Sequence, residues 1–305
     1  MGNTYLSPKN DLVFKLIFGN YENIDLLSGF LQNILDLPDS EYDHIELADT
    51  QLHPDMPEEK LGILDVKLFT KSKNVIDIEI QVWPVDGMQK RILFYTSKMI
   101  TEQVKRGDQY NKIQKTVSIV IADYRLIDDS ETYYNKYRLF DRKTGSQFTD
   151  ILEIVTLELQ KHPENSDKTG LWDWLQFIKG KTEEEWKMPA KRNPQIKQAI
   201  AFVQKLSADE RTKQQAEARE KAQRDHIWRM ESAQKMGLEQ GLSQGISQGI
   251  SQGISQGISQ GERCEKERIV KNALNMGFSD QDICKLTGLT QHEIQQIKQI
   301  DEKEC

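Results

Sequence analysis

The first two thirds of the chain alternate between helix-like and strand-like hydrophobic patterns. Apolar residues recur every three or four positions between 8 and 36, with an interruption at Gly19-Asn20, and a second helical pattern covers 89–105. Runs rich in β-branched residues, which predict strands, lie at 44–51, 62–69, 75–83, 116–122, 134–141 and 152–158. The order of helix, three strands, helix and strand predicts an α/β fold, a mixed sheet with flanking helices.

Helical patterns dominate the chain after residue 168. An aromatic cluster that contains Trp172, Trp174 and Phe177 is interpreted as packing rather than as a platform for stacking bases. From Gln195 to Glu231 the sequence is rich in Gln, Lys, Glu, Arg and Ala, which favours a long exposed helix that leaves the globular body.

A four-residue repeat occupies residues 237–261, where Gly-Ile-Ser-Gln units dominate. A period of four exceeds the 3.6 residues of a helical turn, so an apolar stripe would drift by about 40° per repeat. The glycines weaken a helix by about 1 kcal/mol each, so two interpretations stay open. The tract is either a helix that forms on assembly with a partner copy or a flexible spacer, and we favour the helix.

The last segment has the start and stop signals of short helices, which predict a small helical module. A helix ends near Gly277, Ser279 is a candidate N-cap for a helix over 280–287, and Gly288 separates it from a helix over 291–300. The arrangement resembles a helix-turn-helix, but its last helix has a single basic residue in 291–298. We therefore expect packing or partner binding rather than DNA readout.

Length and composition predict a soluble cytoplasmic protein of several parts. The chain has 305 residues with 37% hydrophobic content, and no apolar run approaches the roughly 20 residues that cross a bilayer. The start lacks the pattern of a secretory signal. Its three cysteines, Cys264, Cys284 and Cys305, show no paired spacing, so we expect reduced thiols and no structural zinc.

The formal net charge of −7 argues against a broad basic surface for nucleic acid. Local basic candidates exist, and we interpret them as solvated surface: Lys187, Lys191 and Arg192, and on the helix after the sheet Lys98, Lys105 and Arg106. The charge weakens a DNA-binding hypothesis without excluding it.

Two neighbouring strand-like runs carry acids among apolar residues. Asp65 lies within 62–69, and Glu79 lies within 75–83 with Gln81 two positions later, on the same face of a strand. Carboxylates in apolar surroundings are costly unless they are paired or bind a metal. The pattern therefore predicts that Asp65 and Glu79 bind Mg²⁺ or Mn²⁺ and that Gln81 points at the substrate.

This D…ExQ arrangement resembles the PD-(D/E)XK nuclease superfamily, and more narrowly the Rpn family of recombination-promoting nucleases, also described as transposases. Further matching segments are the opening helix at 10–19, Arg91-Ile92-Leu93-Phe94-Tyr95, Gly107-Asp108-Gln109-Tyr110 and the strand at 117–124. The likeness covers roughly residues 5–200 through the ordered set.

The resemblance implies a metal-dependent endonuclease that cleaves double-stranded DNA, with Asp65, Glu79 and Gln81 as catalytic residues. It implies a further metal ligand, Asp11, whose alternative role is capping a helix N-terminus. Many superfamily members have Lys where this chain has Gln81, and Lys67 is a hypothetical source of the missing charge. Asp77 shares the face of Glu79 and is either a spare ligand or polar rim, and we favour the rim.

We therefore expect four parts: a PD-(D/E)XK-like domain at 1–193, a helical arm at 194–236, a repeat spacer at 237–261 and a helical module at 262–305. The expected activity is phosphodiester hydrolysis, with a role in recombination or mobile-element biology. Homo-oligomers are expected through the repeat or the tail. The alternative is a catalytically inactive DNA- or protein-binding scaffold that assembles through its C-terminal tail.

Overall fold

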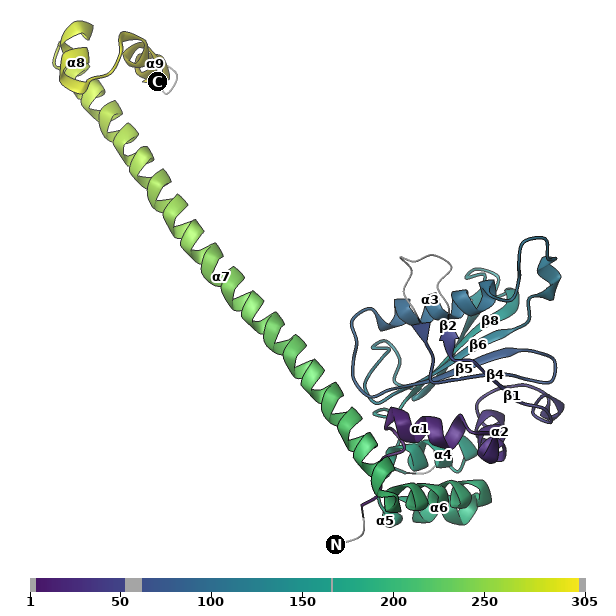
Figure 1. The fold of residues 1–305 in the computed structure, drawn as a ribbon. Coiled ribbons are helices and arrows are strands. Elements are labelled where there is room, and N and C mark those ends of the chain that lie inside the picture. Colours follow the sequence, from purple (N-terminus) through teal and green to yellow (C-terminus); the bar gives the residue numbers. More distant parts are fainter. Residues whose placement is uncertain (1–3, 53–61, 166, 302–305) are drawn as a thin grey trace. The chain divides into compact units, whose positions relative to one another are not determined.

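A computed structural model describes residues 4–52, 62–165 and 167–301 and divides the chain into two compact units, residues 1–224 and 225–305 (Figure 1). Unit one is built on a mixed sheet in the order β1-β4-β5-β6-β8-β7. Its strands are β1 (Glu46–Ala48), β4 (Val66–Phe69), β5 (Val75–Gln81), β6 (Thr116–Ala122), β7 (Tyr134–Phe140) and β8 (Gln147–Glu158). The central neighbours β5, β6 and β8 are parallel, and the outer pairs are antiparallel. This architecture fits the expected α/β fold.

Helices cover both faces of the sheet (Figure 1). The α-helices of unit one before its last are α1 (Asp11–Phe18), α2 (Ile24–Gln32), α3 (Met88–Thr101), α4 (Gly170–Lys179), α5 (Glu183–Arg192) and α6 (Pro194–Ala208). Short 3₁₀ turns are η1 (Tyr21–Asn23), η2 (Asp39–Glu41) and η3 (Tyr110–Lys112). On one face α3 packs against β6, through Met88 and Ile92 against Val120.

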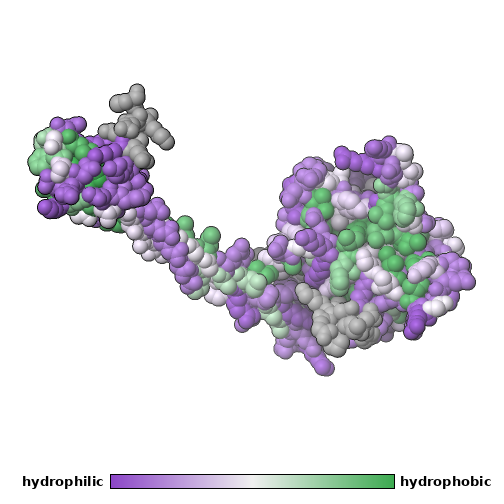
Figure 2. Space-filling model, turned by 90° about the horizontal axis from the view of Figure 1, so that it is seen from above, coloured by the Kyte–Doolittle hydropathy of each residue, from purple (hydrophilic) through white to green (hydrophobic). Residues whose placement is uncertain are grey.

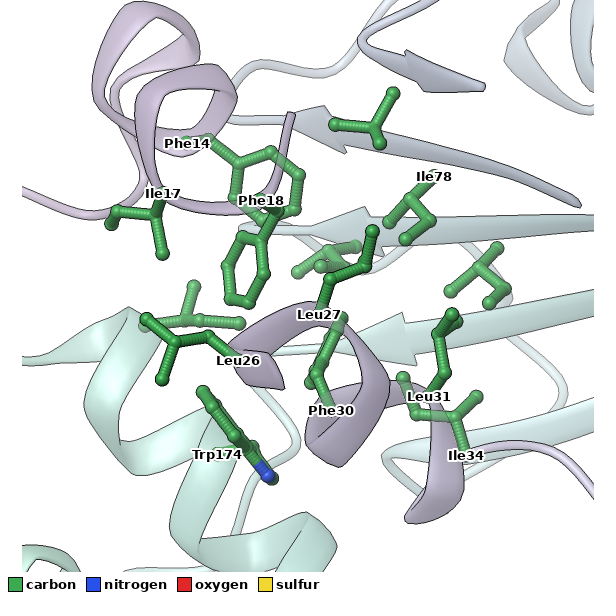
Figure 3. Packing of buried hydrophobic residues seen from close by; sticks show 14 of the residues in the cluster. Phe14, Ile17, Phe18, Leu26, Leu27, Phe30, Leu31, Ile34, Ile78 and Trp174 are labelled. Atoms are coloured by element: carbon green, nitrogen blue, oxygen red, sulfur yellow. The ribbon is translucent and has the colours of Figure 1, made fainter. Parts of the chain in front are cut away.

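The main core lies on the opposite face, between the sheet and α1, α2, α4, α5 and α6. Phe14 and Phe18 of α1, Phe30 of α2 and Trp174 of α4 pack together beneath Ile78 of β5 (Figure 3). These aromatic side chains are fully buried, which confirms that Trp174 and its neighbours serve packing.

The expected strand at 62–69 is two strands in different sheets. β3 (Gly62–Ile63) pairs with β2 (Gln51–Leu52), whereas β4 pairs with β1 and β5. Asp65 therefore lies in a bend between β3 and β4 rather than inside a strand. The expected strand at 44–51 is divided in the same way between β1 and β2. A continuous apolar pattern does not reveal such a transfer between sheets.

The prediction of one long exposed helix from Gln195 to Glu231 is wrong for residues 195–208. Residues 194–208 form α6, which buries Ile196, Ala199 and Val203 in the main core. A break follows at Asp209, whose side chain accepts a hydrogen bond from the Thr212 N–H (2.7 Å) and thereby caps the next helix. The polar composition concealed an apolar stripe at helical spacing.

The helix α7 (Glu210–Asn275) begins in unit one and continues into unit two, where it includes the whole repeat tract 237–261. The tract is thus helical in this structure. Unit two ends in α8 (Asp280–Thr287) and α9 (Gln291–Asp301). Val270, Ile283 and Ile294 form its small core, and Gly288 (φ 69°) makes the turn between α8 and α9.

Candidate functional site

Side chains along β5 alternate between the main core and the face that carries the candidate site. Ile76, Ile78 and Ile80 point into the main core, so Glu79 and Gln81 project from the opposite face, which α3 covers. β5 and β6 are parallel, so their C-terminal ends lie side by side at one edge of the sheet. There the Asp123 N–H donates to the Gln81 carbonyl (2.9 Å). The sequence prediction that Glu79 and Gln81 share a face is consistent with the register of β5.

Asp65 lies directly beside Glu79, although it is not in a strand. Val66 pairs with Ile78 in the antiparallel β4–β5 ladder, so the next position outward brings Asp65 opposite Glu79. One carboxylate oxygen of Asp65 accepts a hydrogen bond from the Ile80 N–H (2.9 Å), and the other lies 3.1 Å from Lys15 Nζ of α1. These two contacts orient the Asp65 carboxylate, and its charge is close enough to raise the pKa of Glu79.

The Glu79 carboxylate is buried with little compensation. Its Oε2 accepts a hydrogen bond from Gln81 Nε2 (3.3 Å) and lies 3.8 Å from Arg91 Nη2, whereas Oε1 has no hydrogen-bond partner among the described residues. Burial raises the pKa of Glu79 to about 7; the charge of Arg91 opposes this rise and that of Asp65 adds to it. The buried carboxylate therefore has fewer partners than its charged form requires.

Asp77 is a correction to the sequence interpretation, which assigned it to a polar rim. Its side chain is buried beneath α3, 2% exposed, between Lys67 and Ser118 on the neighbouring strands. Burial, and then the charges of Glu79 and Asp65, raise the pKa of Asp77 well above its ordinary value. α3 covers this face of β5, so Asp77 is as buried as Glu79.

Asp11 does not cap α1, because that role belongs to Asn10. The Asn10 side chain accepts hydrogen bonds from the Leu12 and Val13 N–H groups. Asp11 Oδ2 instead contacts Arg219 of α7 (2.9 Å), and its buried Oδ1 finds no partner in the described part of the chain. The role of Asp11 as a metal ligand stays a prediction.

Two cations at the site were missed by sequence reasoning. Lys15 lies against Asp65, and Arg91, in the first turn of α3, lies against Glu79 and over the ring of Tyr95 (5.2 Å). Lys67, the hypothetical charge donor, instead contacts Glu102 (3.2 Å). Arg91 stood in the family-like segment 91–95, but nothing local in the sequence indicates which acid it meets.

Two of the basic residues interpreted as solvated surface have internal roles. Arg192 pairs with the buried carboxylate of Asp173 and lies over Trp172 (5.4 Å), and Lys98 is only 8% exposed. Arg192 thus has a partner within the fold, and Lys98 is too buried to contribute to a basic surface.

The donor set fits a divalent cation held by few protein ligands. Within the ranges described, no three His, Cys, Asp or Glu side chains group as a metal cluster. Mg²⁺ in phosphoryl-transfer sites is nevertheless held by one or two carboxylates together with waters and substrate phosphate. Asp65 and Glu79 provide two carboxylates, and the buried unpartnered Oε1 of Glu79 provides a free acceptor.

Comparison with known proteins gives one family. Residues 8–233 match the family model described as PD-(D/E)XK nuclease family transposase. Nucleases of this type generally use divalent metals. No curated protein and no solved structure gave a match. In the described residues no helix has the length and apolar character that a membrane span requires.

Proposed function

Because the chain belongs to the PD-(D/E)XK nuclease family transposases, with three quarters of its length matched, we propose that it is a Mg²⁺- or Mn²⁺-dependent endonuclease that hydrolyses double-stranded DNA. Family membership supports a nuclease or transposase-like role. The observation that carries the finer proposal is the position of Asp65 next to Glu79, whose buried carboxylate has a raised pKa. The proposed setting is recombination or mobile-element biology.

Asp65 and Glu79 would hold the metal, with Asp11 as a further candidate ligand. When bound, the metal ion lowers the pKa of a water and neutralises charge that develops on the phosphate. The Ile80 N–H holds one oxygen of the Asp65 carboxylate, so the other oxygen, which Lys15 contacts, would be the one available to a cation. Release of Lys15 from Asp65 would free an ammonium group at the site.

The missing positive charge at the position of Gln81 is supplied in this proposal by Arg91. The Arg91 guanidinium lies 3.8 Å from Glu79, so it would neutralise charge on a phosphate held beside Asp65 and Glu79. Gln81 Nε2 already donates to Glu79, so its amide orients that carboxylate and leaves the amide oxygen for a water proton.

The test is plasmid cleavage by the full chain with Mg²⁺, with Mn²⁺ and with EDTA, for the wild type and Asp65→Ala. We expect cleavage that requires the metal and falls at least about 100-fold in Asp65→Ala. Asp129→Ala, which removes an exposed carboxylate in the loop after β6, is the matched control and should cleave like the wild type. Activity that survives Asp65→Ala would remove the proposal.

We also propose that the chain self-associates through the repeat. Large apolar side chains form a stripe of unusual exposure along α7, each more than half exposed: Leu238, Leu242, Ile246, Ile250, Ile254 and Ile258. Ser and Gln on the other positions keep the remaining surface polar. Sedimentation analysis should show an oligomer that Ile250→Ser with Ile254→Ser dissociates, whereas Ser247→Ala with Ser251→Ala leaves it intact; an unchanged mass in both would contradict this interface.

This stripe is also what favours the alternative of an inactive assembling scaffold. The two proposals differ at Asp65 and Glu79, since a scaffold has no need of carboxylates there. Calorimetry separates them without an activity measurement. A nuclease should bind Mn²⁺ in a manner that Glu79→Gln abolishes, and a scaffold should not bind it.

A further inference from the structure

The helix α3, which covers the candidate site, is cationic in an acidic protein. It contains no Asp or Glu and presents Lys90 and Arg91, its third basic residue Lys98 being buried, whereas the whole chain has a net charge of −7. Arg91 faces Glu79, and Lys90 is exposed beside it. An anionic polymer that approaches the metal ligands therefore meets α3 as a locally favourable surface.

The same surface exposes large apolar side chains. Phe94 of α3 is 49% exposed, and Trp83 and Val85 in the segment between β5 and α3 are 40% and 46% exposed. Figure 2 views the protein from the α3 side and shows hydrophobic residues gathered on this face of the globular unit. Exposed aromatic rings next to cations are the composition of surfaces that bind unpaired bases.

The aromatic residues lie next to the groups that would handle the phosphate. Phe94 follows Arg91 by three residues, so the two side chains are neighbours on one flank of α3. The centres of the Phe94 and Tyr95 rings are 5.7 Å apart, and Arg91 Cζ lies 5.2 Å from the centre of the Tyr95 ring. Trp83 comes two residues after Gln81, at the end of β5.

We propose that Phe94 and Trp83 stack on unpaired bases adjacent to the scissile phosphate, so that the preferred substrate is DNA with a short unpaired segment within a duplex. The inference rests on the proposed nuclease function and names its substrate class. A fully paired duplex presents phosphates to Arg91 but hides the faces of its bases, so it leaves these rings in water. An unpaired segment buries them.

Charge favours this occupant over an apolar protein partner. A protein that covered Phe94 and Trp83 would also bury Arg91 and Lys90, whose desolvation needs an anionic counterpart. DNA supplies that counterpart in every nucleotide and an aromatic face in every unpaired base. A second copy of the chain is an outcome that the experiment separates.

The test is fluorescence anisotropy with the full chain in EDTA, using a labelled blunt duplex and the same duplex with a central bubble of unpaired thymidines. Wild type should bind the bubble more tightly. Phe94→Ala should weaken bubble binding by roughly 5- to 100-fold, the range for loss of one stacked base, and change blunt-duplex binding by less than about twofold. Trp83→Ala should act in the same direction.

Two variants make the result specific. Phe148→Ala removes a ring that is 85% exposed on β8 and should bind both DNAs like the wild type, whereas Phe94→Tyr keeps a stacking ring and should retain bubble binding. The proposal is overturned if wild type prefers the blunt duplex, if Phe94→Ala behaves like Phe148→Ala, or if Phe94→Ala changes the sedimentation mass instead. None of these outcomes touches Asp65-dependent plasmid cleavage, so a failure here is distinct from a failure of the nuclease proposal.

Discussion

At the scale of single residues, burial without compensation defines the site. Glu79 and Asp77 stand on the same face of β5, beneath α3, and each has a carboxylate oxygen with no partner in the part of the chain described. Among those residues, the Glu79 carboxylate has an ion-pair partner in Arg91 and a hydrogen-bond donor in Gln81. Repulsion between the acids is therefore stored in the fold and is relieved by protonation or by a cation.

This repulsion makes stability depend on pH. The pKa of Glu79 rises from 4.5 to about 7 on folding, so the folded state binds the proton more tightly than the unfolded chain. In EDTA, the contribution of Glu79 to the free energy of unfolding should be highest below pH 4.5. This contribution should fall by about 3 kcal/mol as the pH rises through 7.

Thermal melts between these pH values measure the effect. Glu79→Gln should remove most of the loss of stability at high pH, whereas Glu131→Gln, at an exposed carboxylate, should leave that loss unchanged. Asp77, whose pKa is also raised, contributes with the same sign, so Asp77→Asn should flatten the profile further. A Glu79→Gln protein with the wild-type pH profile would show that the buried carboxylate is compensated in solution.

Arg91 allows a second test at this scale. Removing its charge with Arg91→Gln should lower kcat for plasmid cleavage by about 100-fold with a smaller change in KM, because the charge acts where the phosphate becomes more negative. Arg91→Lys should retain part of the rate, and Lys143→Gln, at an exposed lysine in the turn between β7 and β8, should retain nearly all of it. Equal losses for Lys143→Gln and Arg91→Gln would indicate general attraction of DNA instead.

At the scale of elements, the repeat shows that α7 is helical where propensity is poor. Seven glycines between Gly237 and Gly261 lie in the helix, and for each, no atom of a described residue would come within 4 Å of an added Cβ. By contrast, a Cβ at Gly180 would meet Trp186 Nε1 at 2.6 Å. The glycines of the repeat thus have room for a side chain, whereas the packing of Trp186 requires a glycine at position 180.

Alanine substitution should separate these two cases. Gly249→Ala with Gly253→Ala should raise the helicity of the tract and stabilise it by about 1 kcal/mol per site, as measured by circular dichroism and thermal melting. Gly180→Ala should instead destabilise unit one, because the buried Trp186 must move. Loss of helicity in the Gly249 and Gly253 variant would mean that a partner helix packs closely on those glycines.

At the scale of the whole molecule, the compact unit extends past the nuclease-like sheet. α6 contributes buried Ile196 and Val203, and the first turns of α7 add the buried Ala216 and the Arg219–Asp11 contact. Asn10 Nδ2 also donates to the Ala216 carbonyl (3.0 Å). These contacts tie the start of α7 to α1, next to the candidate site.

Truncation should therefore distinguish the observed unit from the sequence-based boundary at residue 193. A fragment of residues 1–224 should fold cooperatively and retain metal-dependent cleavage, whereas residues 1–193 should expose the core and lose cooperative melting. Limited proteolysis of the full chain gives an independent measurement and should leave a resistant product that ends near 224. Folding of the shorter fragment would contradict the role given to α6.

Much of the architecture follows from local pattern. Alternation of β-branched residues located β5 and β6, and Ser279 and Gly288 marked the limits of α8, since these signals act within a few residues. The pairing of Asp65 with Glu79 was also predicted as a functional pair, from two local runs and an ordered likeness to a family. What these signals share is that they need no knowledge of distant contacts.

The sequence by itself determined the α/β class, the acids Asp65 and Glu79 as candidates, and the nuclease family. Only the tertiary structure decided that Asp65 lies in a bend held by the Ile80 N–H, that Asp77 is buried, and that Lys15 and Arg91 are the cations of the site. Burial and charge pairing depend on which elements meet, and α1, α3 and β5 meet only when the chain is folded.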